Sequence, residues 1–313
     1  MSRRIVPRHP LAAEAHRLFA NDLDAISDGL LLAREKRDKG LHETRKSIKK
    51  ARALLKLLRF ADTDFYAAEN ARLRDLARSL AHARDAAAMV ETVDRLVHSH
   101  PQDAELLEDL RSPLTKRRDE PVIDEAALRS LIDDGLSRSA QMRRDMDSWT
   151  LPVDPKPAAA VLADGVRANL RRAERSMKRA GERAADGDFH DLRKAVKAHW
   201  TQLGLLRDLW PTKVGKARRQ LSALGERLGE HNDLAALLAL LRSREIDLER
   251  KRRTLLRKLV KREKAALAKS TLKTAQRLFD DRPKGLRSAF IKHFQASASS
   301  PEIPTRELGA SHL

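Results

Sequence analysis

A histidine followed by a one-sided row of arginines and lysines occurs twice in this sequence. The first stretch, HETRKSIKKARALLKLLR, begins at His42, and the second, HDLRKAVKAHWTQLGLLR, begins at His190. Arginine grips phosphate oxygens with two parallel hydrogen bonds and lysine supplies mobile positive charge, so both rows suit a polyanion. The candidate binding residues are His42, Arg45, Lys46, Lys49, Arg52, Lys56 and Arg59 in the first stretch, and His190, Arg193, Lys194, Lys197 and Arg207 in the second.

The two stretches are copies of one another at a constant offset. An internal duplication is the simplest explanation, and a repeat has to be recognised before any other inference about the fold. Beyond the basic rows, Leu73, Leu76, Leu80 and Asp85 match Leu221, Leu224, Leu228 and Asp233.

Helical geometry places the cations of the first stretch on one side. At about 100° per residue, Ile48, Ala51 and Leu55 share the opposite, apolar side. No carboxylate follows Glu43 in this row, so its cations are stacked on one another without a compensating negative charge. Each such pair of like charges on a helix costs roughly a few tenths of a kcal/mol of stability. An absent anionic partner explains this pattern, and a merely solvated basic face is the alternative. The repetition of the same residue types at the same spacing favours the partner.

The two histidines add a second attraction for an anion. Gly40 precedes the first histidine and residues 186–188 precede the second, so we expect both in the first turn of a helix. Free backbone amides and the helix dipole favour an anion there. A histidine among cations should have a lowered pKa that rises when an anion binds, so binding is expected to strengthen at mildly acidic pH.

The composition is typical of a soluble all-helical protein. Of 313 residues, 41% are hydrophobic and 35% are charged. No run of about 18 apolar residues occurs and the N-terminus lacks a secretory signal core, so we expect a cytoplasmic protein. The absence of cysteine excludes disulfides, thiolate metal sites and cysteine nucleophiles. The net charge of +19 attracts polyanions such as nucleic acid, an anionic membrane surface or phosphate polymers.

Apolar spacing and helix-breaking residues predict helices along nearly the whole chain. Around the basic rows, we expect breaks at residues 38–40 and 186–188. Beyond the second row, we expect separate helices over residues 213–229 and 234–269.

Short connections between helices favour antiparallel neighbours. The predicted fold class is therefore all-α, with two pseudo-twofold-related antiparallel bundles of about four main helices each. If the histidine-bearing helices face the twofold axis, their rows combine into one basic channel. The predicted domains are 1–150 for the first bundle, 151–157 for a Pro-rich hinge, 158–295 for the second bundle and 296–313 for a disordered tail.

The two basic stretches, followed by LARSLAHARDAAAM and LGERLGEHNDLAAL, resemble the halves of the CHAD family, the conserved histidine α-helical domain. The resemblance covers residues 10–295, and it implies two four-helix bundles around a basic channel. It also implies binding of inorganic polyphosphate, association with polyphosphate granules, and a stand-alone member without the triphosphate tunnel domain of other family members. The sequence departs from the pattern at Trp200, where the first stretch has Arg52.

Other polar residues of the repeats could support different chemistry. His190 and Asp191 suggest a metal-dependent phosphohydrolase, but no matching cluster accompanies them, so no metal site is predicted. Asp85 and Asp233 could ligate a divalent ion bound to phosphate, although capping a helix or orienting an arginine is the favoured interpretation. The helix expected before the second basic stretch offers candidates for secondary contacts with the anion: Arg171, Arg175 and Lys178.

We expect a noncatalytic protein without a cofactor that binds inorganic polyphosphate and organises or targets polyphosphate granules in the cytoplasm. Other phosphate polymers are candidate ligands, because every one of them satisfies arginine. The alternative is a sequence-independent nucleic-acid-binding protein of the nucleoid type. No helix-turn-helix or RNP signature supports it, and at 4% aromatic residues the chain has few stacking platforms. An enzyme acting on phosphoanhydrides would need an acidic metal cluster that the sequence does not provide.

Overall fold

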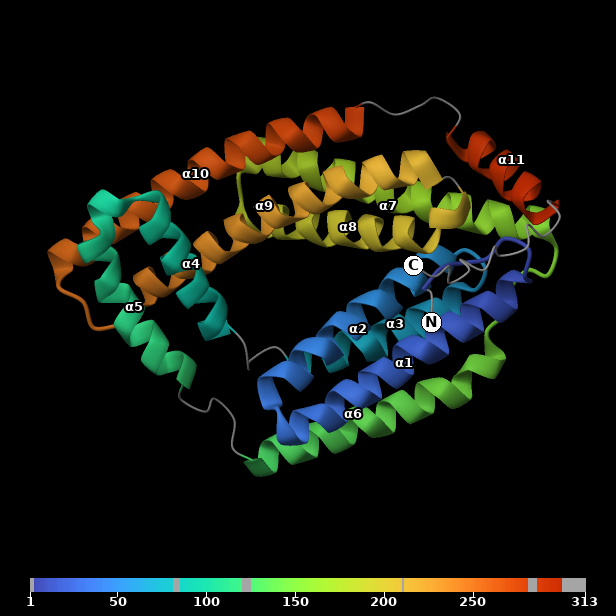
Figure 1. Cartoon of the computed structure of the whole chain (residues 1–313), viewed down its shortest axis with the longest axis horizontal. Helices are drawn as coiled ribbons and strands as arrows, with labels where there is room; N and C mark the ends of the chain where they lie inside the picture. Colours follow the sequence, from blue (N-terminus) through green and yellow to red (C-terminus); the bar gives the residue numbers. More distant parts are fainter. Residues whose placement is uncertain (1–2, 81–84, 120–124, 210, 281–285, 300–313) are drawn as a thin grey trace, which may run out of the picture.

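The computed structural model describes residues 3–80, 85–119, 125–209, 211–280 and 286–299. Every regular element in these residues is a helix, which confirms the all-α fold class (Figure 1). Within the same residues, no helix is long and apolar enough to cross a membrane. The α-helices are α1 (Leu11–Glu35), α2 (Arg37–Leu58), α3 (Thr63–Ser79), α4 (Asp85–Ser99), α5 (Ala104–Asp119), α6 (Glu125–Asp145), α7 (Pro155–Arg183), α8 (Asp186–Leu205), α9 (Pro211–Ser243), α10 (Arg250–Asp280) and α11 (Leu286–Ser299).

Helices α1 and α2 form a close pair that α3 and α6 cover. The chain reverses at Lys36, so the predicted break at residues 38–40 is wrong. Gly40 suggested that break, but it serves helix packing inside α2. A Cβ at Gly40 would lie only 2.2 Å from the backbone nitrogen of Ala33 in α1. Glycine at this position therefore lets the two helices approach each other closely.

The second half continues with α7, α8, α9 and α10. The break predicted at residues 186–188 lies slightly earlier in the structure: α7 ends at Arg183, the next residue Ala184 is left-handed with a φ of 52°, and α8 begins at Asp186. The predicted break between residues 229 and 234 is wrong, because α9 runs without interruption through Ser243. Buried leucines such as Leu228 and Leu237 stabilise the continuous helix and outweigh the local helix-breaking residues.

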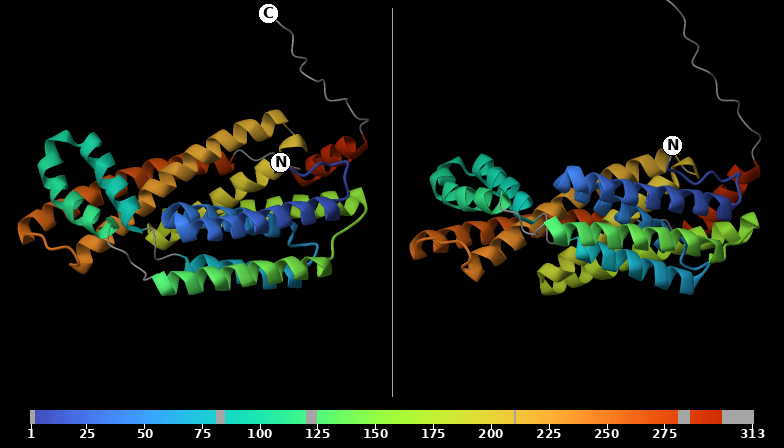
Figure 2. Two further views of the ribbon diagram at one scale, coloured as in Figure 1. Left: turned by 60° about the horizontal axis from the view of Figure 1, so that its bottom comes forward. Right: turned by 90° about the horizontal axis from the view of Figure 1, so that it is seen from below.

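Two clusters of buried apolar side chains hold the helices together. The larger cluster contains Leu57 of α2 and Leu162 of α7, so it spans both sequence repeats. A smaller cluster joins Val93 of α4 with Leu237 of α9 and Leu256 of α10. Figure 2 shows the α4 and α5 pair beside the ends of α9 and α10 in both views. This packing crosses the predicted boundary between the two bundles. The twofold relation and the basic channel stay predictions.

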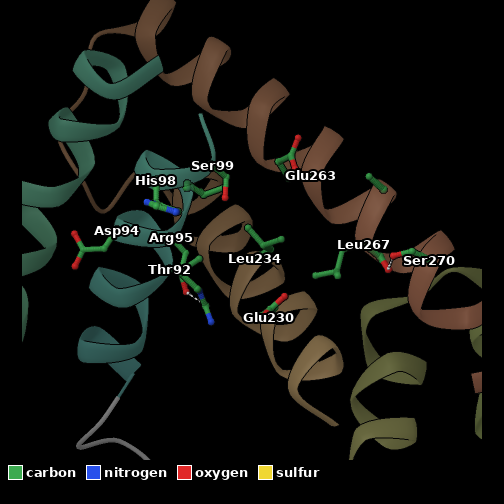
Figure 3. Close-up of a pocket in the computed structure, with 12 residues that line it drawn as sticks. Thr92, Asp94, Arg95, His98, Ser99, Glu230, Leu234, Glu263, Leu267 and Ser270 are labelled. Carbon is green, nitrogen blue, oxygen red and sulfur yellow. Dashed lines mark hydrogen bonds between the residues drawn. The ribbon is translucent and has the colours of Figure 1, made fainter. Parts of the chain in front are cut away.

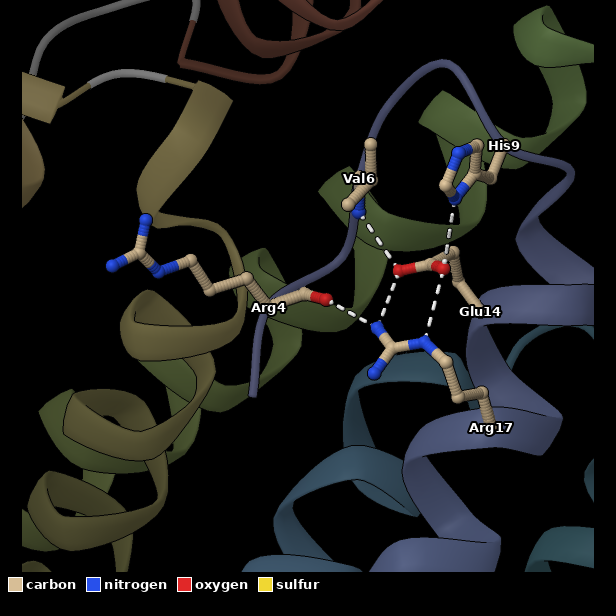
Figure 4. A network of polar contacts seen from close by, with 5 residues as sticks. All are labelled: Arg4, Val6, His9, Glu14 and Arg17. Carbon is tan, nitrogen blue, oxygen red and sulfur yellow. Dashed lines mark hydrogen bonds and ion pairs between the residues drawn. The ribbon is translucent and has the colours of Figure 1, made fainter. Parts of the chain in front are cut away.

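An N-terminal arm connects the two halves. Ile5 is buried, and its backbone N–H donates to the carbonyl of Leu205 at the end of α8 over 2.8 Å. Figure 4 shows how Glu14 of α1 holds this arm by accepting from the backbone of Val6 at 3.0 Å and from Arg17 at 2.7 Å. The arm therefore fixes the start of α1 against the end of α8.

The connection between the repeats and the C-terminal region differ in detail from the predicted segments. Helix α7 already begins at Pro155, because proline is tolerated in the first helical turn. Helix α11 continues through Ser299 and so includes the first residues of the predicted tail. Residues 300–313 lie outside the described part of the chain.

Candidate anion-binding site

Basic residues recur every three or four positions along α2 and its C-terminal cap. We call these five residues the first row: Arg45, Lys49, Arg52, Lys56 and Arg59. This row lies along α3. Arg45 donates to the carbonyl of Leu80 at the end of α3 over 3.0 Å, and Arg52 donates to the side chain of Asn70 over 3.0 Å. Both acceptors are neutral oxygens, and these two contacts position the guanidinium groups of Arg45 and Arg52 along α3.

Lys56 lies at the point where cations from both repeats come together. Burial, followed by the neighbouring charges of Arg52, Arg172 and Lys194, lowers the pKa of Lys56 to about 7. Arg172 belongs to α7 and Lys194 to α8, so helices of the second repeat contribute to this cluster. Within the described part of the chain, Lys56 and Arg172 form no ion pair. The fold thus concentrates positive charge where water is partly excluded.

The second row consists of Arg193 and Lys197 on the side of α8 that faces α9, and of Arg207 in the short 3-10 turn after α8. Two glycines of α9 make room for it. A Cβ at Gly229 would lie 3.1 Å from Nη2 of Arg193, and one at Gly225 would lie 2.9 Å from Cε of Lys197. Long basic side chains therefore lie flat over α9, and burial lowers the pKa of Lys197. The spacing of these two glycines in the string LGERLGE could have indicated from the sequence that long side chains lie over this part of α9.

The histidines occupy different positions in their helices from those predicted. Helix α2 begins at Arg37 and α8 at Asp186, so His42 and His190 lie in the second turn, where amides already serve the helix. The predicted contribution of free first-turn amides is therefore wrong. Nδ1 of His190 lies 2.8 Å from the side-chain nitrogen of Asn232. Burial, then Lys194 and Arg193, lowers the pKa of His190, in the direction predicted.

Two predicted lysines of the basic stretches each have a carboxylate nearby. Lys46 lies 3.1 Å from Glu43, and Lys194 lies 3.4 Å from Asp191, so each exposed ammonium has a local carboxylate. On α7, the cation that acts on Lys56 is Arg172, which the sequence analysis did not select. It borders the buried face of the helix, whereas the predicted secondary contacts lie on the exposed side: Arg171, Arg175 and Lys178.

The acidic residues of the repeats have structural contacts. Asp233 lies within the continuous helix α9, so it caps no helix, and it accepts from Arg95 of α4 at 3.2 Å. His231 is buried and stacked on Phe189, with 4.0 Å between ring centroids, and burial lowers its pKa to about 4. Among the described residues, no group of three or more histidine or acidic side chains could hold a metal ion. The side chain of Asp85 lies outside the described residues.

A hollow of about 640 Å³ between α4, α9 and α10 differs from the basic rows (Figure 3). Its lining mixes the carboxylates of Glu230 and Glu263 and the apolar side chains of Leu234 and Leu267 with Arg95. Carboxylates repel a polyanion and apolar groups offer it no hydrogen bonds. Its mixed charge therefore distinguishes this hollow from the basic rows.

The geometry defines a helical protein that carries two rows of partly buried cations on two repeated helices. The CHAD domain family matches residues 17–242, and this chain belongs to that family. The crystal structure of the CHAD domain from the plant Ricinus communis has the same fold, with a TM-score of 0.52 over 94% of both chains and 20% sequence identity. A search of curated proteins found no match.

Proposed function

We propose that this protein binds inorganic polyphosphate through the first and second rows. The observation that carries the proposal is the cluster around Lys56, where Arg172 and Lys194 add positive charge and no carboxylate of the described residues pairs with Lys56. Polyphosphate carries a negative charge on every phosphate, so one chain can contact many cations at once and release their counterions. The chain's membership of the CHAD family supports the same ligand.

Shape favours a thin chain over a nucleic-acid duplex. Arg52 and Lys56 are half-buried between helices, and Arg52 is also held by Asn70 of α3, so only a part of each side chain is accessible. A flexible polymer can follow such a surface, whereas a rigid duplex touches protruding cations. We infer that the protein gathers polyphosphate at granules in the cytoplasm, without a cofactor and without cleaving the polymer.

Binding of long-chain polyphosphate at physiological salt tests the proposal. The site variant changes His42, Arg45, Lys49, His190, Arg193 and Lys197 to glutamine. The control variant changes Arg257, Lys258, Lys261 and Lys273, exposed cations of α10, and so removes the same number of permanent charges. We expect the site variant to lose binding by at least about a hundredfold while remaining helical, and the control to lose far less. Equal losses in both variants would show that only net charge matters.

Incubation with polyphosphate tests the absence of catalysis. The chain length of the polymer is expected to stay constant in the presence of Mg²⁺ or Mn²⁺, because the described residues hold no acidic cluster for a metal ion. Shortening of the polymer by the native protein, but not by the site variant, would reveal an enzyme.

A further inference from the structure

The second repeat lacks two cations that the first repeat carries. At the repeat offset, Trp200 stands where the first row has Arg52, and Gly204 stands where it has Lys56. The neighbouring helix shows the opposite exchange, because Arg218 of α9 stands where α3 has Asn70. A neutral residue in one repeat thus corresponds to an arginine in the other on both helices of the pair.

The geometry explains this exchange. In the first repeat, Arg52 of α2 reaches across to Asn70 of α3 over 3.0 Å. In the second repeat, Arg218 reaches back from α9, and its Cζ lies 4.5 Å from the centre of the Trp200 ring. A Cβ at Gly204 would lie 3.5 Å from the same guanidinium carbon. Arg218 therefore places its charge over the two α8 positions that have lost theirs.

An open pocket of about 690 Å³ lies at this position, lined by Trp200, Arg207, Arg218, Arg219 and Ser222 among others. Among the residues that the structure describes, no carboxylate lines the pocket and none of its three arginines forms an ion pair. Nε of Arg218 is buried and has no hydrogen-bond partner among the described atoms. Burial and the charge of Arg207 lower the pKa of Arg218. The pocket is a group of guanidinium ions for which the described residues supply no counterion.

We propose that Arg218, Arg219 and Arg207, arranged around Trp200, form a second subsite that binds a phosphoanhydride chain. The cation–π contact with the indole of Trp200 positions the Arg218 guanidinium at this pocket. A chain of closely spaced phosphates can accept hydrogen bonds from several arginines at once, whereas a single carboxylate can satisfy only one of them. This inference rests on the proposed function, because it assigns the same class of ligand to a pocket of its own. The ligand is either a polyphosphate chain or the triphosphate of a nucleotide.

Calorimetric titration with inorganic tripolyphosphate tests the subsite. The pocket variant is Arg218→Gln with Arg219→Gln, and the cluster variant is Lys56→Gln with Arg172→Gln. A control, Arg257→Gln with Lys258→Gln, removes the same charge from α10. We expect native protein to bind at two sites and the pocket and cluster variants to lose one each, with an affinity loss of about tenfold or more. A pocket variant that titrates like the α10 control while remaining folded would overturn the proposal.

Trp200 reports on the pocket independently of total binding. Tripolyphosphate should change the tryptophan fluorescence of native protein, and Trp200→Phe should remove that change while retaining an aromatic platform for Arg218. Competition by ATP distinguishes a nucleotide from an inorganic chain as the ligand. If ATP displaces tripolyphosphate at a lower concentration than unlabelled tripolyphosphate does, the ligand is a nucleotide. If ATP competes no better, the ligand is the inorganic chain. A fluorescence change that persists in Trp200→Phe contradicts the assignment.

The two proposals fail separately. If long-chain polyphosphate does not bind the rows but tripolyphosphate still changes the Trp200 fluorescence, the proposed function fails and the subsite stands. If long chains bind and the pocket variant binds them like the α10 control, only the subsite is overturned.

Discussion

Lys56 is a side chain whose charge the fold leaves uncompensated. It is half-buried, its neighbours Arg52 and Lys194 are also cations, and no described carboxylate pairs with it. Removing an ammonium group from water without a partner is unfavourable, and burial in this setting favours the neutral amine. A residue that destabilises the free protein in this way is best explained by an anionic ligand that supplies the missing charge.

Replacement of Lys56 by methionine should separate stability from binding. Methionine has a similar length and no charge, so the Lys56→Met variant is expected to gain about 1 kcal/mol in the free energy of unfolding. The same change should weaken polyphosphate binding by about tenfold, because one charge contact is lost. Urea unfolding and a binding titration measure the two effects. A less stable variant with native affinity would contradict this role of Lys56.

Binding should also take up protons. Burial, followed by neighbouring cations, lowers the pKa of Lys56 to about 7 and lowers that of His190. A bound polyanion favours the charged forms and raises both pKa values, so affinity should fall as the pH rises from about 6 to about 8.5. Calorimetry in buffers of different ionisation enthalpy measures the proton uptake. Lys56→Met with His190→Gln should flatten the profile, and a steep profile in this variant would assign the effect to other groups.

At the scale of elements, the crossing of α2 and α7 depends on a glycine. A Cβ at Gly165 would lie 1.9 Å from the carbonyl oxygen of Leu57, whereas nothing lies within 4 Å of a Cβ at Gly181 in the same helix. Gly165→Ala should therefore lower the free energy of unfolding by about 3 kcal/mol or more. Gly181→Ala should raise it by up to about 1 kcal/mol, because alanine favours the helix. Similar unfolding curves for both variants would show that the two helices do not cross this closely.

The N-terminal arm is expected to loosen in acid. Burial alone would raise the pKa of Glu14, but hydrogen bonds from Arg17, Val6 and His9 outweigh it and hold the pKa below its usual 4.5. The ionised carboxylate therefore stabilises the fold above about pH 4.5, and this contribution is lost as the pH falls through the lower folded-state pKa. Glu14→Gln should lower the free energy of unfolding by about 2 kcal/mol at neutral pH. Urea unfolding at pH 7 and in acid should show the difference shrink; a constant difference would contradict the role of the carboxylate.

Local patterns predicted most helices and the first row, because both depend on periodicity within one segment. The break expected near Asp233 was wrong because that prediction weighed residues 229–233 alone, whereas the apolar side of α9 continues through them. The interplay of Arg218 with Trp200 could not be found from one helix, since the charge comes from a neighbour in space. Comparing Asn70 with Arg218, its counterpart at the repeat offset, would have indicated this contact.

At the scale of the whole molecule, the repeats are packed into one another. The larger cluster of buried residues includes Leu57 and Leu162, and the smaller one places α4 and α5 of the first repeat on α9 and α10 of the second. Cations from α2, α7 and α8 meet around Lys56 only because of this packing. The net charge of +19 draws any polyanion to the surface, so the packing of the rows has to provide selectivity.

Competition between long-chain polyphosphate and duplex DNA for the native protein, at physiological salt and equal concentrations of phosphate, tests this selectivity most directly. We predict that polyphosphate stays bound, that DNA at equal phosphate concentration does not displace it, and that the site variant loses this preference. Displacement by DNA at equal phosphate concentration, with the same result for the site variant, would contradict a role of the two rows in recognising polyphosphate.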